Sequence, residues 1–86
     1  MSDASFMRRA LELAARARDE GEVPVGAVVV QDGSILGEGW NRPLTAADAT
    51  SHAEIEAIRA ACRTAHNYRL AGATLSETNR DPSRED

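Results

Sequence analysis

The apolar run of residues 25–30, VGAVVV, limits the folds open to this chain more than any other segment does. It is rich in β-branched residues and has no polar position, so it predicts a strand that is covered on both faces. Asp32-Gly33 follows as a signal for a tight hairpin turn, and residues 34–40 predict the returning strand. Because a lone hairpin is marginal in water, helices elsewhere in the chain must cover it.

The returning strand contains two glycines, Gly37 and Gly39, which weaken it. Glycine within a strand is typical of a β-bulge or of an element that packs closely against the backbone. We expect one of the two here.

One amphipathic helix is predicted before the hairpin in the chain, over residues 4–20, and a second after it, from Ser51 to about Ala65. Residues 73–75 open a short third strand. This order of elements predicts an α/β sandwich with helices packed on a sheet. The apolar positions expected to face the core are Phe6, Ala10, Leu13, Ala14 and Ala17 in the first helix, and Ile55, Ile58, Cys62 and Ala65 in the second.

The last eleven residues, SETNRDPSRED (76–86), contain no apolar side chain. Such a segment cannot offset the entropy cost of its own ordering. We therefore expect residues 1–75 to form the folded unit and residues 76–86 to form a disordered polar tail.

Composition excludes several classes of function. The net charge of −4 is not that of a strongly basic nucleic-acid binder, and the ten basic residues are all arginines. No apolar run approaches the ~20 residues of a membrane span, and charged residues interrupt the N-terminus where a signal peptide would be apolar. A cytoplasmic protein without membrane contact is expected. The single cysteine excludes an internal disulfide.

The stretch TSHAEIEAI, residues 50–58, has two interpretations. Ser51 followed by Glu54 predicts a helix capping box. His52-Ala53-Glu54 also has the H-x-E spacing of a zinc half-site. At a helix start the dipole disfavours the imidazolium form, so His52 would be neutral and able to bind a metal, while Glu54 could transfer protons.

Four segments, in this order and spacing, resemble the bacterial tRNA-specific adenosine deaminases of the cytidine-deaminase-like superfamily. They are EVPVGAVVV (22–30), GEGWNRP (37–43), SHAEI (51–55) and NYRL (67–70), and the resemblance covers about residues 5–75. It implies a three-layer sandwich of the cytidine-deaminase type, present here as helix, β-hairpin, helix and the start of a third strand.

The resemblance also implies roles for individual residues. His52 corresponds to the histidine ligand of one Zn²⁺ ion per subunit, and Glu54 to the general acid and base. Asn41 corresponds to the asparagine that hydrogen-bonds the flipped nucleoside. The implied reaction is hydrolytic deamination of adenosine to inosine at the wobble position of a tRNA anticodon loop, by an enzyme that is typically a homodimer.

The chain departs from the family after residue 75, where relatives continue into a P-C-x-x-C segment that supplies two further zinc ligands. Cys62 does not replace them, because ten residues of helix place it about 15 Å from His52. A catalytic zinc site normally needs three protein ligands. We therefore expect a truncated deaminase domain that holds zinc weakly and is inactive alone.

Two alternatives stay open. One is a deaminase of the same superfamily that acts on guanine, cytosine or their nucleosides. The other is a non-catalytic fragment that serves as an interaction module.

Overall fold

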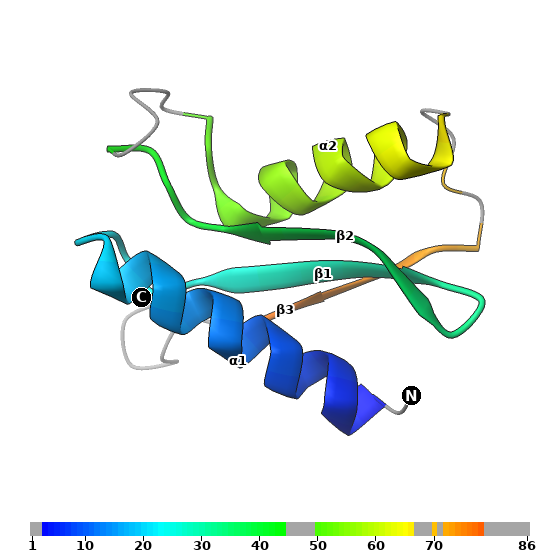
Figure 1. Cartoon of the computed structure of the whole chain (residues 1–86), viewed down its shortest axis with the longest axis horizontal. Coiled ribbons are helices and arrows are strands. Elements are labelled where there is room, and N and C mark those ends of the chain that lie inside the picture. The colour runs from blue at the N-terminus through cyan, green and yellow to red at the C-terminus, as the bar shows by residue number, and fades with distance from the viewer. Residues whose placement is uncertain (1–2, 45–49, 67–69, 71, 79–86) are drawn as a thin grey trace, which may run out of the picture.

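The structure, a computed structural model, describes residues 3–44, 50–66, 70 and 72–78. Its three strands form one antiparallel sheet in the order β2-β1-β3, and the two helices lie on opposite faces of this sheet (Figure 1). This is the α/β sandwich predicted from the sequence. The elements are α1 (Asp3–Asp19), β1 (Gly26–Gln31), β2 (Ser34–Trp40), α2 (Ala53–Ala65) and β3 (Thr74–Glu77).

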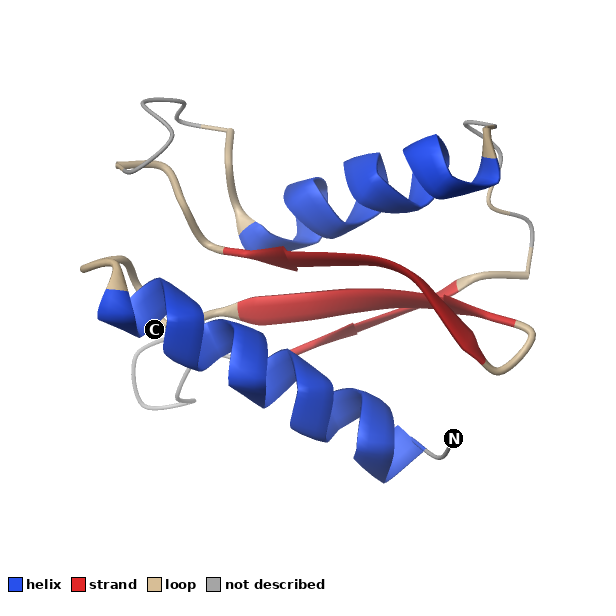
Figure 2. Ribbon diagram, in the orientation of Figure 1, coloured by secondary structure: helices blue, strands red, loops and turns tan. Residues whose placement is uncertain are grey.

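The central strand β1 is buried on both faces, as its sequence predicts. It lies between the two helices (Figure 2). Val28 and Val30 pack against Phe6 and Leu13 of α1. The alternate residues, Ala27 and Val29, pack instead against α2. Because side chains alternate along a strand, a run without polar positions places apolar side chains against both helices.

The first helix buries the predicted side chains. All five positions expected from its periodicity are at most 7 % exposed. In the described ranges, neither helix is long and apolar enough to cross a membrane. The buried positions of α1 are Phe6, Ala10, Leu13, Ala14 and Ala17.

The hairpin between β1 and β2 has the predicted turn and an irregular register. Asp32 and Gly33 both have positive φ, 53° and 77°, as a tight two-residue hairpin turn requires. Val29 pairs with Gly37 whereas Val30 pairs with Ile35, so one extra residue of β2 forms a bulge. The bulge expected from the glycines is therefore present.

The second helix also packs closely on the same glycines. A Cβ atom at Gly37 would collide with the backbone of Ala57 and Ala61, and one at Gly39 would lie 2.5 Å from the carbonyl oxygen of Ala53. The backbones of α2 and β2 can approach this closely only because β2 has no side chain at these two positions.

The predicted apolar stripe of this helix is therefore wrong. The residues of α2 that pack on the sheet are Ala53, Ala57 and Ala61, each fully buried, whereas Ile58 is 38 % exposed. At this short separation only a methyl group fits between helix and sheet, so the small residues face inward. Hydrophobicity alone favours the branched residues, and the sequence does not reveal how closely the helix approaches the sheet.

The third strand extends beyond the expected boundary at residue 75. β3 runs to Glu77, and Thr78 is buried, with backbone and hydroxyl both bonded to Gly26 at 2.9 Å. The expectation of a polar tail failed for residues 76–78 because backbone hydrogen bonds to β1, rather than apolar side chains, hold this segment. Residues 79–86 lie outside the described residues.

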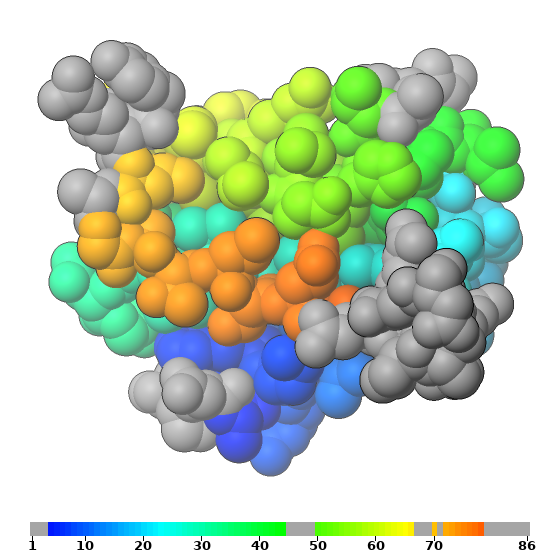
Figure 3. Space-filling view, turned by 180° about the vertical axis from the view of Figure 1, so that it is seen from behind, coloured from blue at the N-terminus to red at the C-terminus, as the bar shows by residue number. Residues whose placement is uncertain are grey.

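The strand β3 lies at the edge of the sheet. Figure 3 shows it at the surface, between α1 on one side and α2 on the other. Leu75, in the middle of this strand, is 43 % exposed.

Candidate functional site

Two of the residues singled out in the sequence, Asn41 and His52, meet in the structure. The Asn41 side-chain oxygen Oδ1 lies 3.1 Å from Nδ1 of His52, although eleven residues separate them. Asn41 is buried at 6 % exposure and His52 is half-buried. An amide oxygen only accepts hydrogen bonds, so this contact is a hydrogen bond when Nδ1 of His52 carries a proton.

Backbone hydrogen bonds hold both residues in place. The Asn41 N–H donates to the carbonyl oxygen of Val25 at 3.0 Å, which fixes the end of β2 against the start of β1. The next residue, Arg42, donates its N–H to the carbonyl oxygen of Ser51 at 2.7 Å. A backbone hydrogen bond between Arg42 and Ser51 therefore joins the two segments, each one residue away from the contact between Asn41 and His52.

The predicted capping box is wrong. The N-cap of α2 is His52 rather than Ser51, and its side chain makes no capping hydrogen bond. Ser51 is fully buried, one residue before the cap. The N-cap lies one residue later than predicted, because the carbonyl group of Ser51 accepts a hydrogen bond from the backbone N–H of Arg42.

Glu54 lies in the first turn of α2, two residues after His52, and is half-buried. Glu56 also belongs to this turn. Carboxylates are favourable there because the helix dipole places partial positive charge at the N-terminus. The two adjoining segments therefore carry an imidazole, a carboxamide and a carboxylate, of which the imidazole and the carboxamide are in contact.

The residues that the structure describes do not fit a catalytic zinc ion. Among the described residues, no three side chains of His, Cys, Asp or Glu gather closely enough to hold a metal. The chain has two histidines and one cysteine in all. Cys62 and His66 lie in or at the end of α2, some 15–20 Å along the helix from His52. A catalytic zinc needs about three protein ligands within bonding distance, and His52 supplies one.

A second cluster, which the sequence did not predict, surrounds the residues next to Asn41. The indole N–H of Trp40 donates to Glu20 at 2.9 Å, and Arg42 lies 3.6 Å from the same carboxylate oxygen. The guanidinium groups of Arg16 and Arg42 lie 4.5 and 5.2 Å from the centre of the Trp40 ring. Trp40 and Arg42 belong to the segment GEGWNRP quoted above, whereas Glu20 lies outside the quoted segments.

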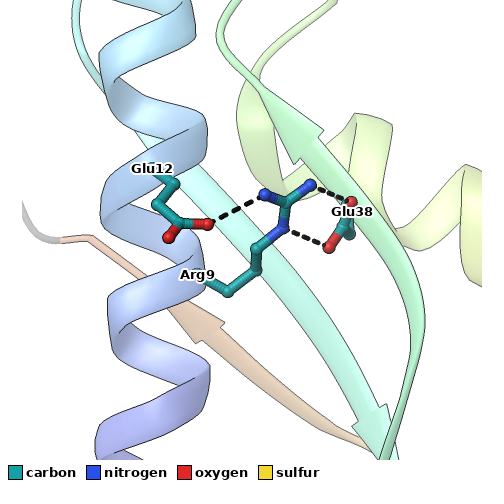
Figure 4. Close-up of polar contacts among 3 residues, drawn as sticks. All are labelled: Arg9, Glu12 and Glu38. Atoms are coloured by element: carbon teal, nitrogen blue, oxygen red, sulfur yellow. Dashed lines mark hydrogen bonds and ion pairs between the residues drawn. The ribbon is translucent and has the colours of Figure 1, made fainter.

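The face of the sheet that packs on α1 carries an ion pair. Arg9 donates two hydrogen bonds to Glu38, at 2.6 and 2.9 Å, and a third to Glu12 at 2.9 Å (Figure 4). Hydrogen bonding from Arg9 holds the pKa of Glu38 below its usual value, and the same contact raises the pKa of Arg9. Glu38 lies beside Val28, which faces α1, so this pair is separated from α2 by the sheet.

Comparison with known proteins identifies the family of this chain. Residues 1–80 match the family described as the cytidine and deoxycytidylate deaminase zinc-binding region. The chain is 51 % identical over 77 residues to the tRNA-specific adenosine deaminase of Haemophilus influenzae, covering 88 % of this chain and 44 % of that protein. The chain thus spans about half the length of the curated relatives it matches.

Solved structures share the fold. A structure from a study of tRNA:A34 deaminases that edit the wobble position superimposes with a TM-score of 0.84 and 44 % identity, over 87 % of this chain and 58 % of that one. The guanine deaminase of Bacillus subtilis superimposes with a TM-score of 0.86 and 39 % identity, over 95 % and 54 %. The chain therefore belongs to the cytidine and deoxycytidylate deaminase zinc-binding family, and its sandwich has the fold of the solved structures of related deaminases.

Proposed function

We propose that this chain carries the histidine, glutamate and asparagine of a zinc-dependent hydrolytic deaminase that converts adenosine to inosine at the wobble position of tRNA. The contact between Asn41 and His52, with Glu54 in the first turn of α2, is the observation that carries the proposal. The reaction replaces the exocyclic amine of adenine with oxygen from water and releases ammonia. Glu54 would take a proton from the water and deliver one to the leaving amine.

In this proposal His52 is a zinc ligand and Asn41 binds the substrate. The zinc ion supplies the activated water in this class of enzyme. Its remaining ligands must come from residues other than those described here, since the chain's other histidine and its cysteine lie at the far part of α2. The proposal therefore concerns a site that the chain completes together with further residues.

The tRNA substrate is favoured by the relatives. The first curated matches are tRNA-specific adenosine deaminases at 46–51 % identity, and the segments quoted above match that group. A substrate of this kind implies a cytoplasmic enzyme that recognises an anticodon loop, in which an unstacked base is accessible at low cost. We also propose a homodimer, as the resemblance implies, to be tested by light scattering after gel filtration.

A second candidate function is deamination of free guanine. It is supported by the superposition on a guanine deaminase, whose TM-score of 0.86 is no lower than that of the tRNA deaminase structure. The shared fold does not distinguish the two substrates, because function depends on the site rather than on the fold.

A chimera tests both candidates. Residues 5–78 of this chain would replace the aligned segment of the Haemophilus influenzae deaminase, so that the remaining zinc ligands come from the host. We expect the chimera to retain zinc and to form inosine in tRNA, with no ammonia release from guanine. Glu54→Gln in the chimera should lower kcat by about 10²-fold or more, because the proton transfer is lost.

The unmodified host protein is the control for the assay, and circular dichroism verifies folding of each variant. A folded, zinc-loaded chimera that deaminates guanine and leaves tRNA unchanged would replace the first candidate by the second. A folded, zinc-loaded chimera with neither activity would refute both.

A further inference from the structure

Two arginine side chains and one tryptophan ring form a surface next to the candidate site. The guanidinium groups of Arg16 and Arg42 lie 4.5 and 5.2 Å from the centre of the Trp40 ring. Both distances are within the ~6 Å at which the face of an aromatic ring attracts a cation. We call these three residues the Arg–Trp surface. Trp40 and Arg42 are the neighbours of Asn41 in the chain, so the surface adjoins the residue proposed to bind the substrate.

The backbone of Arg42 is fixed at the edge of this site. Its N–H donates to the carbonyl oxygen of Ser51 at 2.7 Å, and the N–H of Asn41 donates to the carbonyl oxygen of Val25 at 3.0 Å. The Cα atoms of consecutive residues are only about 3.8 Å apart. A nucleotide whose base is bound at Asn41 carries one phosphate on each side of its sugar. The Arg42 side chain therefore starts close to the path of the RNA backbone.

The Nε atom of Arg42 is a donor that the fold leaves unused. It is buried and has no hydrogen-bond partner among the described residues. Oε1 of Glu20 lies 3.6 Å from it, beyond hydrogen-bond distance, and accepts the indole N–H of Trp40 at 2.9 Å instead. The Arg42 side chain is nevertheless 36 % exposed, so solvent reaches other parts of it. Arginine can bind phosphate oxygens through two parallel hydrogen bonds, so a phosphate that displaced Glu20 would suit this side chain.

The charges of the Arg–Trp surface are unequal. The Glu20 carboxylate contacts Trp40 and Arg42, while Arg16 approaches the same ring from α1. Two guanidinium groups therefore share one carboxylate. Although the whole chain has a net charge of −4, the local distribution of charge decides where a phosphate binds.

Two further carboxylates near this surface are matched by arginines of their own. Glu38 of β2 accepts two hydrogen bonds from Arg9, at 2.6 and 2.9 Å. Glu56 of α2 lines a hollow beside Arg42, and Arg63 lines the same hollow. The positive excess of the Arg–Trp surface is therefore not cancelled by these two side chains.

We propose that the Arg–Trp surface binds the RNA backbone next to the nucleotide that is deaminated: Arg42 takes a phosphate, Arg16 supplies a second cation, and Glu20 competes with the phosphate for Arg42. The inference rests on the proposed function, which supplies the RNA. A purely structural role of Glu20 makes a different prediction. Removing the charge of a carboxylate that only held α1 to β2 would not strengthen RNA binding, whereas removing a competitor does.

The experiment measures binding by the full 86-residue chain and needs no turnover. A fluorescently labelled RNA hairpin with the sequence of a tRNA anticodon arm is titrated with the chain, and fluorescence anisotropy gives the Kd at several salt concentrations. The slope of log affinity against log salt reports the phosphates bound, at about 0.7 per phosphate of a single strand. We expect binding that weakens as salt rises. No binding at low salt would overturn the inference.

Arg42→Gln should raise the Kd about tenfold and reduce the salt slope by about 0.7, because one charged hydrogen-bonded contact to phosphate is lost. Arg16→Gln should act in the same direction with a smaller effect. Arg18→Gln is the matched control, because Arg18 is 69 % exposed and lies about 200° around α1 from Arg16. Circular dichroism verifies folding of each variant. Equal effects of Arg42→Gln and Arg18→Gln would overturn the inference.

Glu20→Gln distinguishes competition from a structural role, also if Arg42→Gln does not fold. Glutamine keeps an oxygen that accepts the indole N–H of Trp40 and removes the negative charge. The Kd should therefore fall by about twofold to fivefold, the range expected for removing one exposed ion pair. An unchanged or higher Kd in the folded Glu20→Gln variant would show that the carboxylate does not compete with RNA, and would refute the inference.

The outcome is separate from that of the proposed function. An inactive chimera, together with the expected changes in RNA binding, would count against the proposed deaminase activity alone. A chimera active on tRNA, together with an unchanged Kd in Arg42→Gln and Glu20→Gln, would count against the Arg–Trp surface alone.

Discussion

At the scale of single residues, the ion pair of Arg9 and Glu38 links α1 to β2 (Figure 4). The guanidinium binds both carboxylate oxygens of Glu38, the geometry in which arginine and carboxylate interact most strongly. Both side chains are about one third exposed, so water and salt weaken the interaction. Its contribution is correspondingly modest.

The pH dependence follows from the lowered pKa of Glu38. A carboxyl group whose pKa is lower in the folded state stabilises the fold above its unfolded-state pKa, and this stabilisation is lost as the pH falls through the folded-state pKa. Glu38→Gln should lower the free energy of unfolding at neutral pH by about 0.5–1 kcal/mol and have less effect in acid. Urea unfolding at several pH values measures this.

Glu12→Gln is the control for this prediction, because the Glu12 side chain is 59 % exposed and makes a single hydrogen bond to Arg9. Its effect should be smaller than that of Glu38→Gln at every pH. An effect of Glu38→Gln that persists undiminished in acid would show that the carboxyl group acts by packing rather than by charge.

The sequence identified the candidate residues but not all of their contacts. His52, Glu54 and Asn41 were singled out by motif and resemblance, and two of them hydrogen-bond in the structure. The link from Glu20 to Trp40 joins residues twenty positions apart, and no local pattern predicts it. The predicted capping box is wrong because Ser51 accepts a backbone hydrogen bond from Arg42, a contact that forms only when β2 and α2 are in place.

At the scale of elements, α1 and the hairpin follow from local patterns, whereas the inward face of α2 does not. Both the branched and the alanine positions of α2 recur with helical spacing, so periodicity alone permits either face. The glycines of β2 decide between them, because they allow a backbone approach at which only alanine fits.

Gly37→Ala tests this close packing. The new methyl group would collide with the backbone of Ala57 and Ala61, so α2 would have to move away from the sheet. Overpacking of this kind costs about 1–3 kcal/mol, and we expect the upper end because backbone cannot rotate away. Thermal and urea unfolding measure the loss.

Gly33→Ala is the matched control. Nothing lies within 4 Å of a Cβ at this turn position, and its positive φ of 77° accounts for the remaining cost, about 1 kcal/mol. A Gly37→Ala variant no less stable than Gly33→Ala would mean that α2 does not depend on the glycines of β2.

At the scale of the whole molecule, the helices cover both faces of β1, while no three metal-binding side chains gather in the part of the chain that the structure describes. The 86-residue chain, purified with added zinc and dialysed, should retain far less than one zinc per chain, because His52 is a single ligand and Cys62 lies about 15 Å away. Mass spectrometry of the metal content measures this.

The chimera described above is the positive control, since its host supplies the other ligands and should retain one zinc per chain. Stoichiometric, dialysis-resistant zinc in the 86-residue chain would show that the donors of this chain, in one subunit or across several, suffice for a site.

The sequence by itself determined the order of the elements, the two-sided burial of β1, the turn at Asp32-Gly33 and the family. These features depend on the spacing of apolar residues and on the residue types at turns, both of which are set by residues close together in the sequence. The tertiary structure alone decided which face of α2 packs inward, how far β3 extends, and that Asn41 meets His52. Each of these depends on backbone distances between distant segments, and such distances exist only once the layers have packed.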